Sequence, residues 1–311
     1  MDISVIIPTY NRLWCLPRAV DSCRHTKCRT QIIVVDDGST DGTWEWLKTQ
    51  SDVLALRQPN QGKPWAVNLA FASSRGRFIR LLDSDDFLAP GAIDLQFKAA
   101  LATGAGVVYG RVDDYDEATK AVTVYPDTPQ WDDFIAVMLG EGYGSHFLGM
   151  QFARELVQNA PHRPEFAYRD DRMFLLEVAL QHPLVHATAG CTGYWVKHTR
   201  QMHTGYHGLK TTVAAWQMWK LYEHTLNRLE ATGELTPRRA RAATRVLWSA
   251  AHEIARSHLA DAAIIAKRVY ELEPAFVPPE TKFVVWLYRR LGYVNTQRLF
   301  RLRRILRGRA S

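Results

Sequence analysis

Several features that would assign this chain to a common class are missing from its sequence. No run of apolar residues reaches the length that a membrane-spanning helix needs. The four cysteines, Cys15, Cys23, Cys28 and Cys191, lack the short paired spacings of a zinc site or a redox motif. Nothing near Met1 resembles a secretory signal, so we expect a cytoplasmic protein with free thiols.

Two kinds of glycine-rich nucleotide-binding loop are also missing. No G-x-G-x-x-G follows the first expected strand, at residues 3–7, and this argues against a dehydrogenase. No glycine-rich triphosphate-binding loop follows that strand either, and this argues against a nucleotidyltransferase. Both classes of nucleotide enzyme are therefore disfavoured.

Acidic residues are absent from the C-terminal tail, Thr281 to Ser311, which contains nine Lys or Arg residues. The net charge of the whole chain is +7, yet the first 280 residues hold 30 basic and 32 acidic groups. Apolar residues recur at partial helical spacing between the arginines, with Phe283, Trp286 and Leu299 among them. Such a helix suits a peripheral position on the anionic inner face of a membrane. Packing on the rest of the protein is the alternative, and nucleic acid is not expected because no reader motif accompanies the tail.

The order of expected elements indicates an α/β domain followed by a helical domain. Apolar residues make up 47% of the chain and charged residues 23%, as in ordinary globular proteins. Short apolar runs at 3–7, 31–35, 53–56, 78–82 and 106–112 alternate with helical patterns at 16–23, 43–49, 63–73 and 91–103. This alternation is typical of a mostly parallel sheet with helices on both faces. After residue 208 only helices are expected, at 209–232, 237–258, 259–272 and two shorter pieces after Pro279.

An acidic cluster directly follows the expected strand that ends at Leu82. Asp83, Asp85 and Asp86 place three carboxylates within four residues, and these would repel one another without a cation between them. Oxygen ligands of this kind favour Mg²⁺ or Mn²⁺. Open α/β sheets bind ligands at the carboxyl ends of their strands, so the cluster indicates a metal and diphosphate site. A solvated acidic turn that caps the next helix is the alternative.

Four motifs occur in order along the first half of the chain. They are Val5 to Arg12 (VIIPTYNR), Val34 to Ser39 (VVDDGS), Asn60-Gln61-Gly62 followed by Asn68, and Asp83 to Asp86 (DSDD). Together they resemble the family 2 glycosyltransferases, which have the Rossmann-like GT-A fold, and the similarity runs from about residue 2 to residue 204. The resemblance implies transfer of a sugar from a nucleotide diphosphate to an acceptor hydroxyl, with inversion at the anomeric carbon.

The resemblance also implies which residues hold the nucleotide. The loop Pro8-Thr9-Tyr10 and Asp37 would hold the base. A carboxylate accepts from the imide N–H of uracil or thymine but finds no such donor on cytosine, so a UDP- or dTDP-sugar is expected. A tight turn with an Asp capping the next helix is the other interpretation of the Asp37 motif.

Further nucleotide contacts are expected from Arg12, Lys63, Asp83 and Ser84, with Asp83 on the ribose side. Lys63 would add positive charge near the phosphates, and the alternative is a solvated surface lysine. Many family members carry an arginine where this chain has Val67, so that phosphate contact is missing.

The metal and the catalytic base follow from the same resemblance. Asp85 is the expected ligand of Mn²⁺ or Mg²⁺, Asp86 is an alternative ligand, and His198 is a third contact or only a structural histidine. The ion would neutralise the leaving diphosphate. The base that takes the acceptor proton is expected to be Asp171, while Asp170 favours the start of a helix. Neighbouring arginines and the helix dipole are expected to lower the pKa of Asp171.

The expected domains are a catalytic domain at 1–207 and a helical domain with the basic tail at 208–311. The nucleotide-sugar half would cover about 1–112 and the acceptor half about 113–207. The loop from Gly140 to His146 would be a substrate lid or a plain connector. A glycan, a polysaccharide or a lipid-linked acceptor is expected, and the helical domain offers a surface for a homodimer. The alternative function is a non-catalytic module that binds nucleotide-sugars or glycans.

Overall fold

A computed structural model describes residues 1–142, 146–201 and 208–308 of the chain. The chain forms two compact units, the first made of Met1–Phe134 and Gly144–Thr204 and the second of Ile135–Tyr143 and Gly205–Ser311. The predicted boundary between residues 207 and 208 lies next to a segment outside the described residues, and it stays a prediction. Part of the expected lid, residues 143–145, also lies outside them.

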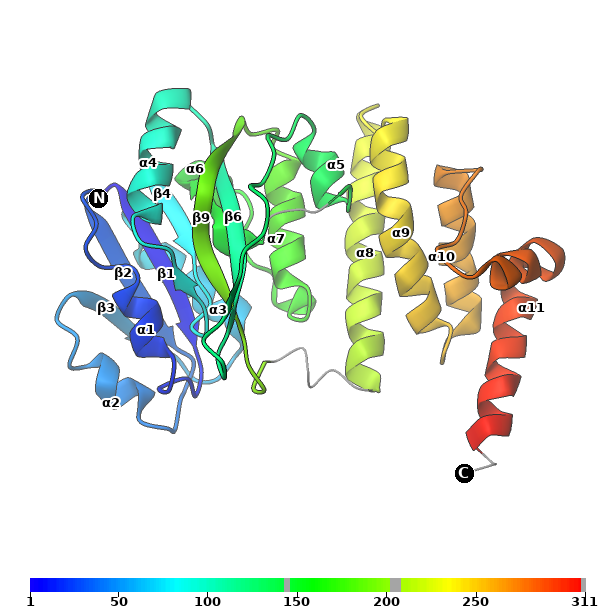
Figure 1. Cartoon of the computed structure of the whole chain (residues 1–311), viewed down its shortest axis with the longest axis horizontal. Helices are drawn as coiled ribbons and strands as arrows, with labels where there is room; N and C mark the ends of the chain where they lie inside the picture. The colour runs from blue at the N-terminus through cyan, green and yellow to red at the C-terminus, as the bar shows by residue number, and fades with distance from the viewer. Residues whose placement is uncertain (143–145, 202–207, 309–311) are drawn as a thin grey trace. The chain divides into compact units, whose positions relative to one another are not determined.

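The first unit is built on a nine-stranded mixed sheet with the strand order β3-β2-β1-β4-β8-β6-β9-β5, and β7 pairs with β6 (Figure 1). Its strands are β1 (Ile3–Thr9), β2 (Thr30–Asp36), β3 (Val53–Arg57), β4 (Phe78–Leu81), β5 (Phe87–Leu88), β6 (Val107–Asp116), β7 (Val122–Thr123), β8 (Met150–Ala153) and β9 (Val185–Lys197). Its helices are α1 (Leu16–Asp21), α2 (Thr43–Leu47), α3 (Lys63–Ser73), α4 (Ala92–Thr103), α6 (Arg154–Gln158) and α7 (Asp170–Ala179). Helix α5 (Phe134–Met138) begins at the border of the two units. The predicted α/β fold is confirmed.

Strands β1 to β4 are parallel, and this brings the polar residues at their carboxyl ends to one edge of the sheet. The β1 and β2 side chains are almost fully buried because helices cover both faces of the sheet, so the strands read as continuous apolar runs. Thr9 pairs with Asp36 at the end of these two strands. Strand β4 ends with Leu81 opposite Ile6 of β1, so the acidic cluster follows at the same edge.

Strand β9 was not predicted from the sequence, nor were β5 and β8. It is 13 residues long and contains Gly190 and Gly193 among threonines, a composition that resembles a loop. It runs parallel to β6 with two register shifts, and β5 pairs antiparallel to it through Phe87 and Tyr194. The end of β9 therefore lies beside the acidic cluster, which precedes β5 in the chain.

A buried arginine connects β4 to the elements around it. Arg80 is fully buried in β4, and its Nη2 donates to the carbonyls of Leu148 at 2.8 Å and Thr192 at 2.9 Å. Its other terminal nitrogen donates to the side chain of Gln96. These acceptors are neutral, and burial lowers the pKa of Arg80 to about 10. One guanidinium thus fixes β4, which carries the acidic cluster at its end, to β9.

The second unit consists of helices, as predicted. They are α8 (Leu209–Ala231), α9 (Pro237–Ile254), α10 (Leu259–Leu272) and α11 (Lys282–Gly308), and Trp248 of α9 is among the largest fully buried side chains. The two shorter pieces expected after Pro279 are the two parts of α11, which Gly292 interrupts with a φ of 74°. A non-glycine residue rarely adopts that angle. Among the described residues, no helix is long and apolar enough to cross a membrane.

Replacing the buried arginine tests its structural role. We expect Arg80→Met to lower the free energy of unfolding by about 3 kcal/mol or more, because two buried carbonyls and Gln96 lose a charged donor. Urea unfolding followed by circular dichroism measures this. The same substitution at Arg29, whose side chain is 74% exposed, should cost much less, because water screens a surface ion pair. Equal losses in the two variants would contradict the role given to Arg80.

Candidate functional site

The acidic cluster forms a tight turn between β4 and β5. The amide of Asp86 donates to the carbonyl of Asp83 at 3.0 Å, which closes the turn and brings the side chains together. One carboxylate oxygen from each of Asp83, Asp85 and Asp86 lies within 4.8 Å of the others. The three predicted acids thus form one group of carboxylate oxygens with the spacing to hold a metal ion.

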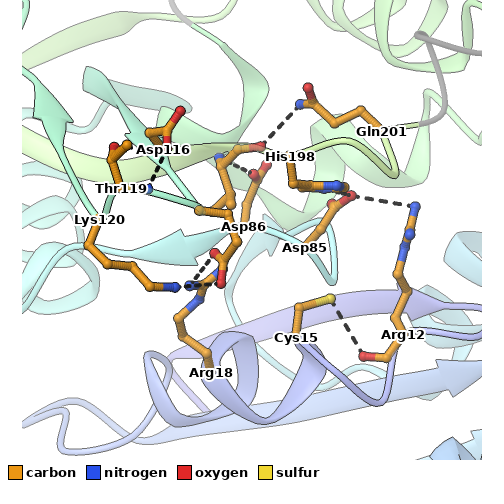
Figure 2. Close-up of polar contacts among 12 residues, drawn as sticks. Arg12, Cys15, Arg18, Asp85, Asp86, Asp116, Thr119, Lys120, His198 and Gln201 are labelled. Atoms are coloured by element: carbon orange, nitrogen blue, oxygen red, sulfur yellow. Dashed lines mark hydrogen bonds and ion pairs between the residues drawn. The ribbon is translucent and has the colours of Figure 1, made fainter.

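Asp85 lies between two basic side chains that come from distant parts of the sequence (Figure 2). Its Oδ2 is 3.1 Å from Nε2 of His198, just after β9, and 3.6 Å from Nη2 of Arg12, which follows β1. The edge of the Trp14 ring packs against the His198 ring at 5.0 Å. An open depression of about 500 Å³ borders Trp14 and is lined by Asn11, Leu13, Trp14, Thr40, Asp41 and Arg200.

Asp86 connects the turn to β9. Its Oδ1 accepts a hydrogen bond of 2.9 Å from the amide of Val196, and the residue is only 3% exposed. Burial, and then the charges of Asp85 and Asp83, raise the pKa of Asp86 well above its ordinary value. The bond to Val196 also sets the position of His198, two residues further along. Asp86 therefore has a structural role, and its role as an alternative metal ligand stays a prediction.

Lys63 connects the acidic cluster to the start of α7. Its Nζ is 2.9 Å from Oδ1 of Asp83 and 2.8 Å from Oδ1 of Asp171, and it lies 4.7 Å from the centre of the Phe147 ring. Burial lowers the pKa of Lys63, but the two carboxylates outweigh burial and the net pKa is well above the ordinary value. The alternative of a solvated surface lysine is wrong, because Lys63 is held by two acids at once.

The expectation that Asp171 has a lowered pKa is also wrong. Removal from water and the neighbouring charge of Asp170 raise the pKa of Asp171, and Lys63 offsets only part of this effect. Asp170 behaves in the opposite way, since the charge of Lys63 and the contact with His162 outweigh burial and lower its pKa. Two adjacent acids in the first turn of α7 thus differ in basicity, and Asp171 is the stronger base.

The structure explains Asn68 of the third motif, whose role was not predicted from the sequence. Its side-chain amide donates to the carbonyl of His162 at 2.7 Å, and its side-chain oxygen accepts from the His162 amide at 3.0 Å. Nδ1 of His162 lies 3.4 Å from Oδ2 of Asp170. Asn68 therefore fixes α3, which begins at Lys63, to the segment that precedes α7.

The predicted base-binding residues gather at the end of β1 and β2. Oδ1 of Asp37 accepts from Gln58 Nε2 at 2.7 Å and from the Gln61 amide at 2.9 Å, while Oδ2 accepts from the Gly62 amide at 2.8 Å. The carboxylate is thus already fixed by its neighbours. A carboxylate oxygen can accept two bonds, so Oδ2 keeps one acceptor position for a ligand.

The other residues of this loop differ in exposure. Oγ1 of Thr9 is buried without a hydrogen-bond partner among the described residues, while the Tyr10 side chain is 46% exposed. Pro8 belongs to β1, and Ser84 is buried in the acidic turn. None of the described contacts joins Asp37 or this loop to Lys63. The base-binding roles of these residues stay predictions.

His146 belongs to the site and was missed from the sequence. Its ring stacks on the Trp195 ring at 5.3 Å, and burial together with the charges of Lys63, Lys197 and Arg172 lowers its pKa to about 3. It is therefore neutral at ordinary pH. A single histidine at the end of a glycine-rich loop gave no pattern that could have identified it.

Comparison with known proteins identifies the family of this chain. The model of the family described as glycosyl transferase family 2 matches residues 4–162, and this chain belongs to that family. GlyG, a glycosyltransferase of Streptococcus pneumoniae, is 33% identical over 122 residues, which are 37% of this chain and 40% of that protein. Chondroitin synthase of Pasteurella multocida is 36% identical over 104 residues, or 32% of this chain and 11% of that protein. The chain thus matches less than half of the length of either relative.

Solved structures with the same fold cover nearly the whole chain. TarS of S. aureus, solved with UDP-GlcNAc, is similar with a TM-score of 0.57 and 14% identity, over 97% of this chain and 90% of that chain. The mannosyltransferase PcManGT of Pyrobaculum calidifontis, solved with GDP-Man and Mn²⁺, has a TM-score of 0.51 and 18% identity, over 96% of this chain and 86% of that chain. At such low identity the likeness shows the fold alone, which is the predicted GT-A fold.

The Lys63 bridge predicts a pH-dependent loss of stability. The folded-state pKa of Asp83, about 7, is above the ordinary 3.8, so its contribution to stability is complete at low pH and is lost as the pH rises through 7. Removing Lys63 raises the folded-state pKa values of Asp83 and Asp171 further. We therefore expect Lys63→Met to lower the urea midpoint more at pH 8 than at pH 5, whereas Lys48→Met, at an exposed position, changes it equally at both. A pH-independent loss in Lys63→Met would contradict the bridge.

Proposed function

We propose that this chain is an inverting, metal-dependent glycosyltransferase that moves a sugar from a UDP- or dTDP-activated donor to a hydroxyl group. The acceptor is a glycan, a polysaccharide or a lipid-linked sugar. The observation that carries the proposal is the bridge made by Lys63, which joins an acid of the cluster after β4 to an acid at the start of α7. The acidic cluster, proposed to bind the diphosphate, and Asp171, proposed to accept the acceptor's proton, are therefore joined by one lysine side chain.

The residues of the acidic cluster fit a divalent cation. Their carboxylate oxygens converge within 4.8 Å, and the burial that raises the pKa values of Asp83 and Asp86 is a cost that a cation would remove. Asp85 is the principal ligand in this proposal, Asp86 is an alternative, and His198 is close enough to Asp85 to join them. When bound, Mn²⁺ or Mg²⁺ supplies positive charge that stabilises the leaving diphosphate.

The chain's own side chains perform the remaining steps. Asp171 accepts the proton of the acceptor hydroxyl, and its raised pKa makes it a more effective base at neutral pH. Lys63 provides a fixed positive charge beside Asp83, where the negative charge of the diphosphate increases as the sugar leaves. The two residues touch in this structure, so binding of an anionic donor would compete with Asp171 for the lysine.

The nucleotide half of the proposal rests on the loop after β1 and on Asp37. The free acceptor position on Oδ2 of Asp37 suits the imide N–H of uracil or thymine, and the unpartnered Oγ1 of Thr9 lies at the same edge of the sheet. Tyr10 is exposed enough to cover a base. The neighbours TarS and PcManGT were solved with UDP-GlcNAc and with GDP-Man and Mn²⁺, and these ligands support a nucleotide-sugar here.

Calorimetry tests the donor site directly. We expect UDP or dTDP to bind more tightly than GDP or CDP, and only with Mn²⁺ or Mg²⁺ present. Asp37→Ala should abolish the preference for UDP and dTDP over the other nucleotides, because it deletes the proposed acceptor for the imide N–H. Asp85→Ala should abolish the effect of the metal on binding, because it deletes the proposed principal metal ligand. Asp52→Ala, at a surface acid paired with Arg24, is the matched control and should bind as the wild type does. Equal, metal-independent binding of all four nucleotides would contradict the proposal.

Catalysis is tested at the proposed base. Asp171→Asn keeps the shape of the side chain but cannot take a proton, so we expect kcat to fall by about 10²- to 10⁴-fold while donor binding changes little. Release of UDP or dTDP from a panel of their sugars, with water or an added acceptor, measures this. Glu165→Gln, at an exposed position near α7, serves as the control.

The outcome at Asp171 also distinguishes the alternative function. A chain that binds donor but shows neither hydrolysis nor transfer, in wild type and Asp171→Asn alike, is a binding module on the same fold. Inversion is then tested on any active donor by NMR, since an α-linked donor should first give a β-configured product. An α-configured first product would contradict the proposed mechanism while leaving transfer itself intact.

A further inference from the structure

Helix α11 of the second unit has one side that is firmly anchored. Tyr288 is buried, its hydroxyl lies 2.8 Å from Nε2 of His252, and it accepts from Nε2 of Gln297 at 2.9 Å. The rings of Tyr288 and Trp248 meet edge to face at 5.2 Å. Gln297 lies beyond the interruption at Gly292, and its Nε2 is also 3.1 Å from Nε2 of His252 in α9. Both parts of α11 are therefore fixed to the unit, and this determines which side chains face outward.

The first part of α11 presents two large aromatic side chains to solvent. Phe283 is 66% exposed and Trp286 is 52% exposed, and their rings stack with centres 6.0 Å apart. At 3.6 residues per turn, Lys282, Arg289 and Arg290 fall on the same third of the helix surface, on either side of the aromatic pair. All three basic residues are exposed. The outward side therefore has an apolar centre between positive charges.

The second part of α11 repeats this arrangement with aliphatic side chains. Leu299 is 44% exposed and Leu302 is 56% exposed, and the spacing of three residues puts both on one side of the helix. Arg298 and Arg303 flank the two leucines and are exposed as well. Exposed apolar side chains flanked by basic residues thus occur on both sides of Gly292. The surface is therefore more than one isolated apolar residue.

The positive charges of this surface lack carboxylate partners. Within residues 208–303, as far as the structure describes them, Lys282, Arg289 and Arg290 form no ion pair. The preceding acid in the chain, Glu280, faces His252 at 3.5 Å, and from Thr281 to Ser311 no acid occurs. The surface is thus both apolar and strongly cationic.

We propose that the outward sides of the two parts of α11, with Phe283 and Trp286 on the first, Leu299 and Leu302 on the second, and their flanking basic residues, dock on an anionic phospholipid membrane. Aromatic and aliphatic side chains enter the boundary between headgroups and acyl chains, and the arginines bind the phosphates. A nucleic acid would match the charges but would leave Leu299 and Leu302 without a role. Since no described helix can span a bilayer, the mode is a helix that lies on the surface. The proposal stands apart from the transferase activity proposed above.

The first test is co-sedimentation of the full chain with vesicles. Binding should be at least ten-fold tighter to phosphatidylcholine with one quarter phosphatidylglycerol than to phosphatidylcholine alone. Arg289→Gln with Arg290→Gln should weaken it about 10- to 30-fold, at roughly five-fold for each basic residue near the surface. Phe283→Ser with Trp286→Ser should weaken it at least ten-fold. Equal binding to both kinds of vesicle would overturn the proposal.

Matched controls come from the same unit. Ile264 of α10 is 61% exposed and the Lys267 side chain is 80% exposed, so Ile264→Ser and Lys267→Gln remove similar groups from another helix. Both variants should bind vesicles as the wild type does. Circular dichroism and the melting temperature establish that each variant is folded. If the controls lose binding as fully as the α11 variants do, the surface assigned here is wrong.

A second test distinguishes insertion from charge attraction and from other partners. Vesicles with brominated acyl chains should quench tryptophan fluorescence, and Trp286→Phe should reduce the quenching while keeping most of the binding. Quenching that is unchanged in Trp286→Phe would overturn insertion of α11. Binding of transfer RNA more tightly than vesicles, or dimerisation that the Phe283 and Trp286 substitutions abolish, would replace the membrane with a nucleic acid or a second copy of the chain.

Discussion

The candidate site depends on how the chain keeps several carboxylates close together and partly out of water. Two of them, Asp83 and Asp171, share the ammonium of Lys63. A third, Asp85, lies between His198 and Arg12 (Figure 2). Without these cations the repulsion between the acids would displace the turn after β4 or the start of α7. The same cations make the site suitable for an anionic ligand, because a bound diphosphate can replace the carboxylates as the partner of these cationic side chains.

The first half of the fold could be predicted because local sequence determines it. Strands β1 and β2 are buried on both faces, so continuous apolar runs such as Val5 to Ile7 mark them clearly. Each is followed by polar residues, and parallel pairing brings those residues to one edge. The acidic cluster could likewise be predicted to be one group of carboxylates, because its three acids lie within four residues.

The second half of the site could not be predicted because it depends on pairing between distant segments. Strand β9 contains glycines and threonines, and it pairs with β6, about 80 residues earlier in the chain. Its end reaches the acidic cluster through Asp86 and Val196. The pKa of Asp171 was misjudged for a related reason. The sequence shows the arginines beside it, but not its removal from water or its contact with Lys63, which is 108 residues away in the chain.

The proposed function requires the acidic cluster after β4 to bind a divalent cation together with a nucleotide diphosphate. Crystals of the chain grown with UDP and MnCl₂, measured at the manganese absorption edge, test it most directly. We expect an anomalous peak in contact with the Asp85 carboxylate and with the diphosphate, and a Lys63 side chain directed at the phosphates. Bound UDP with no anomalous peak near Asp83, Asp85 or Asp86 would contradict metal binding at this cluster.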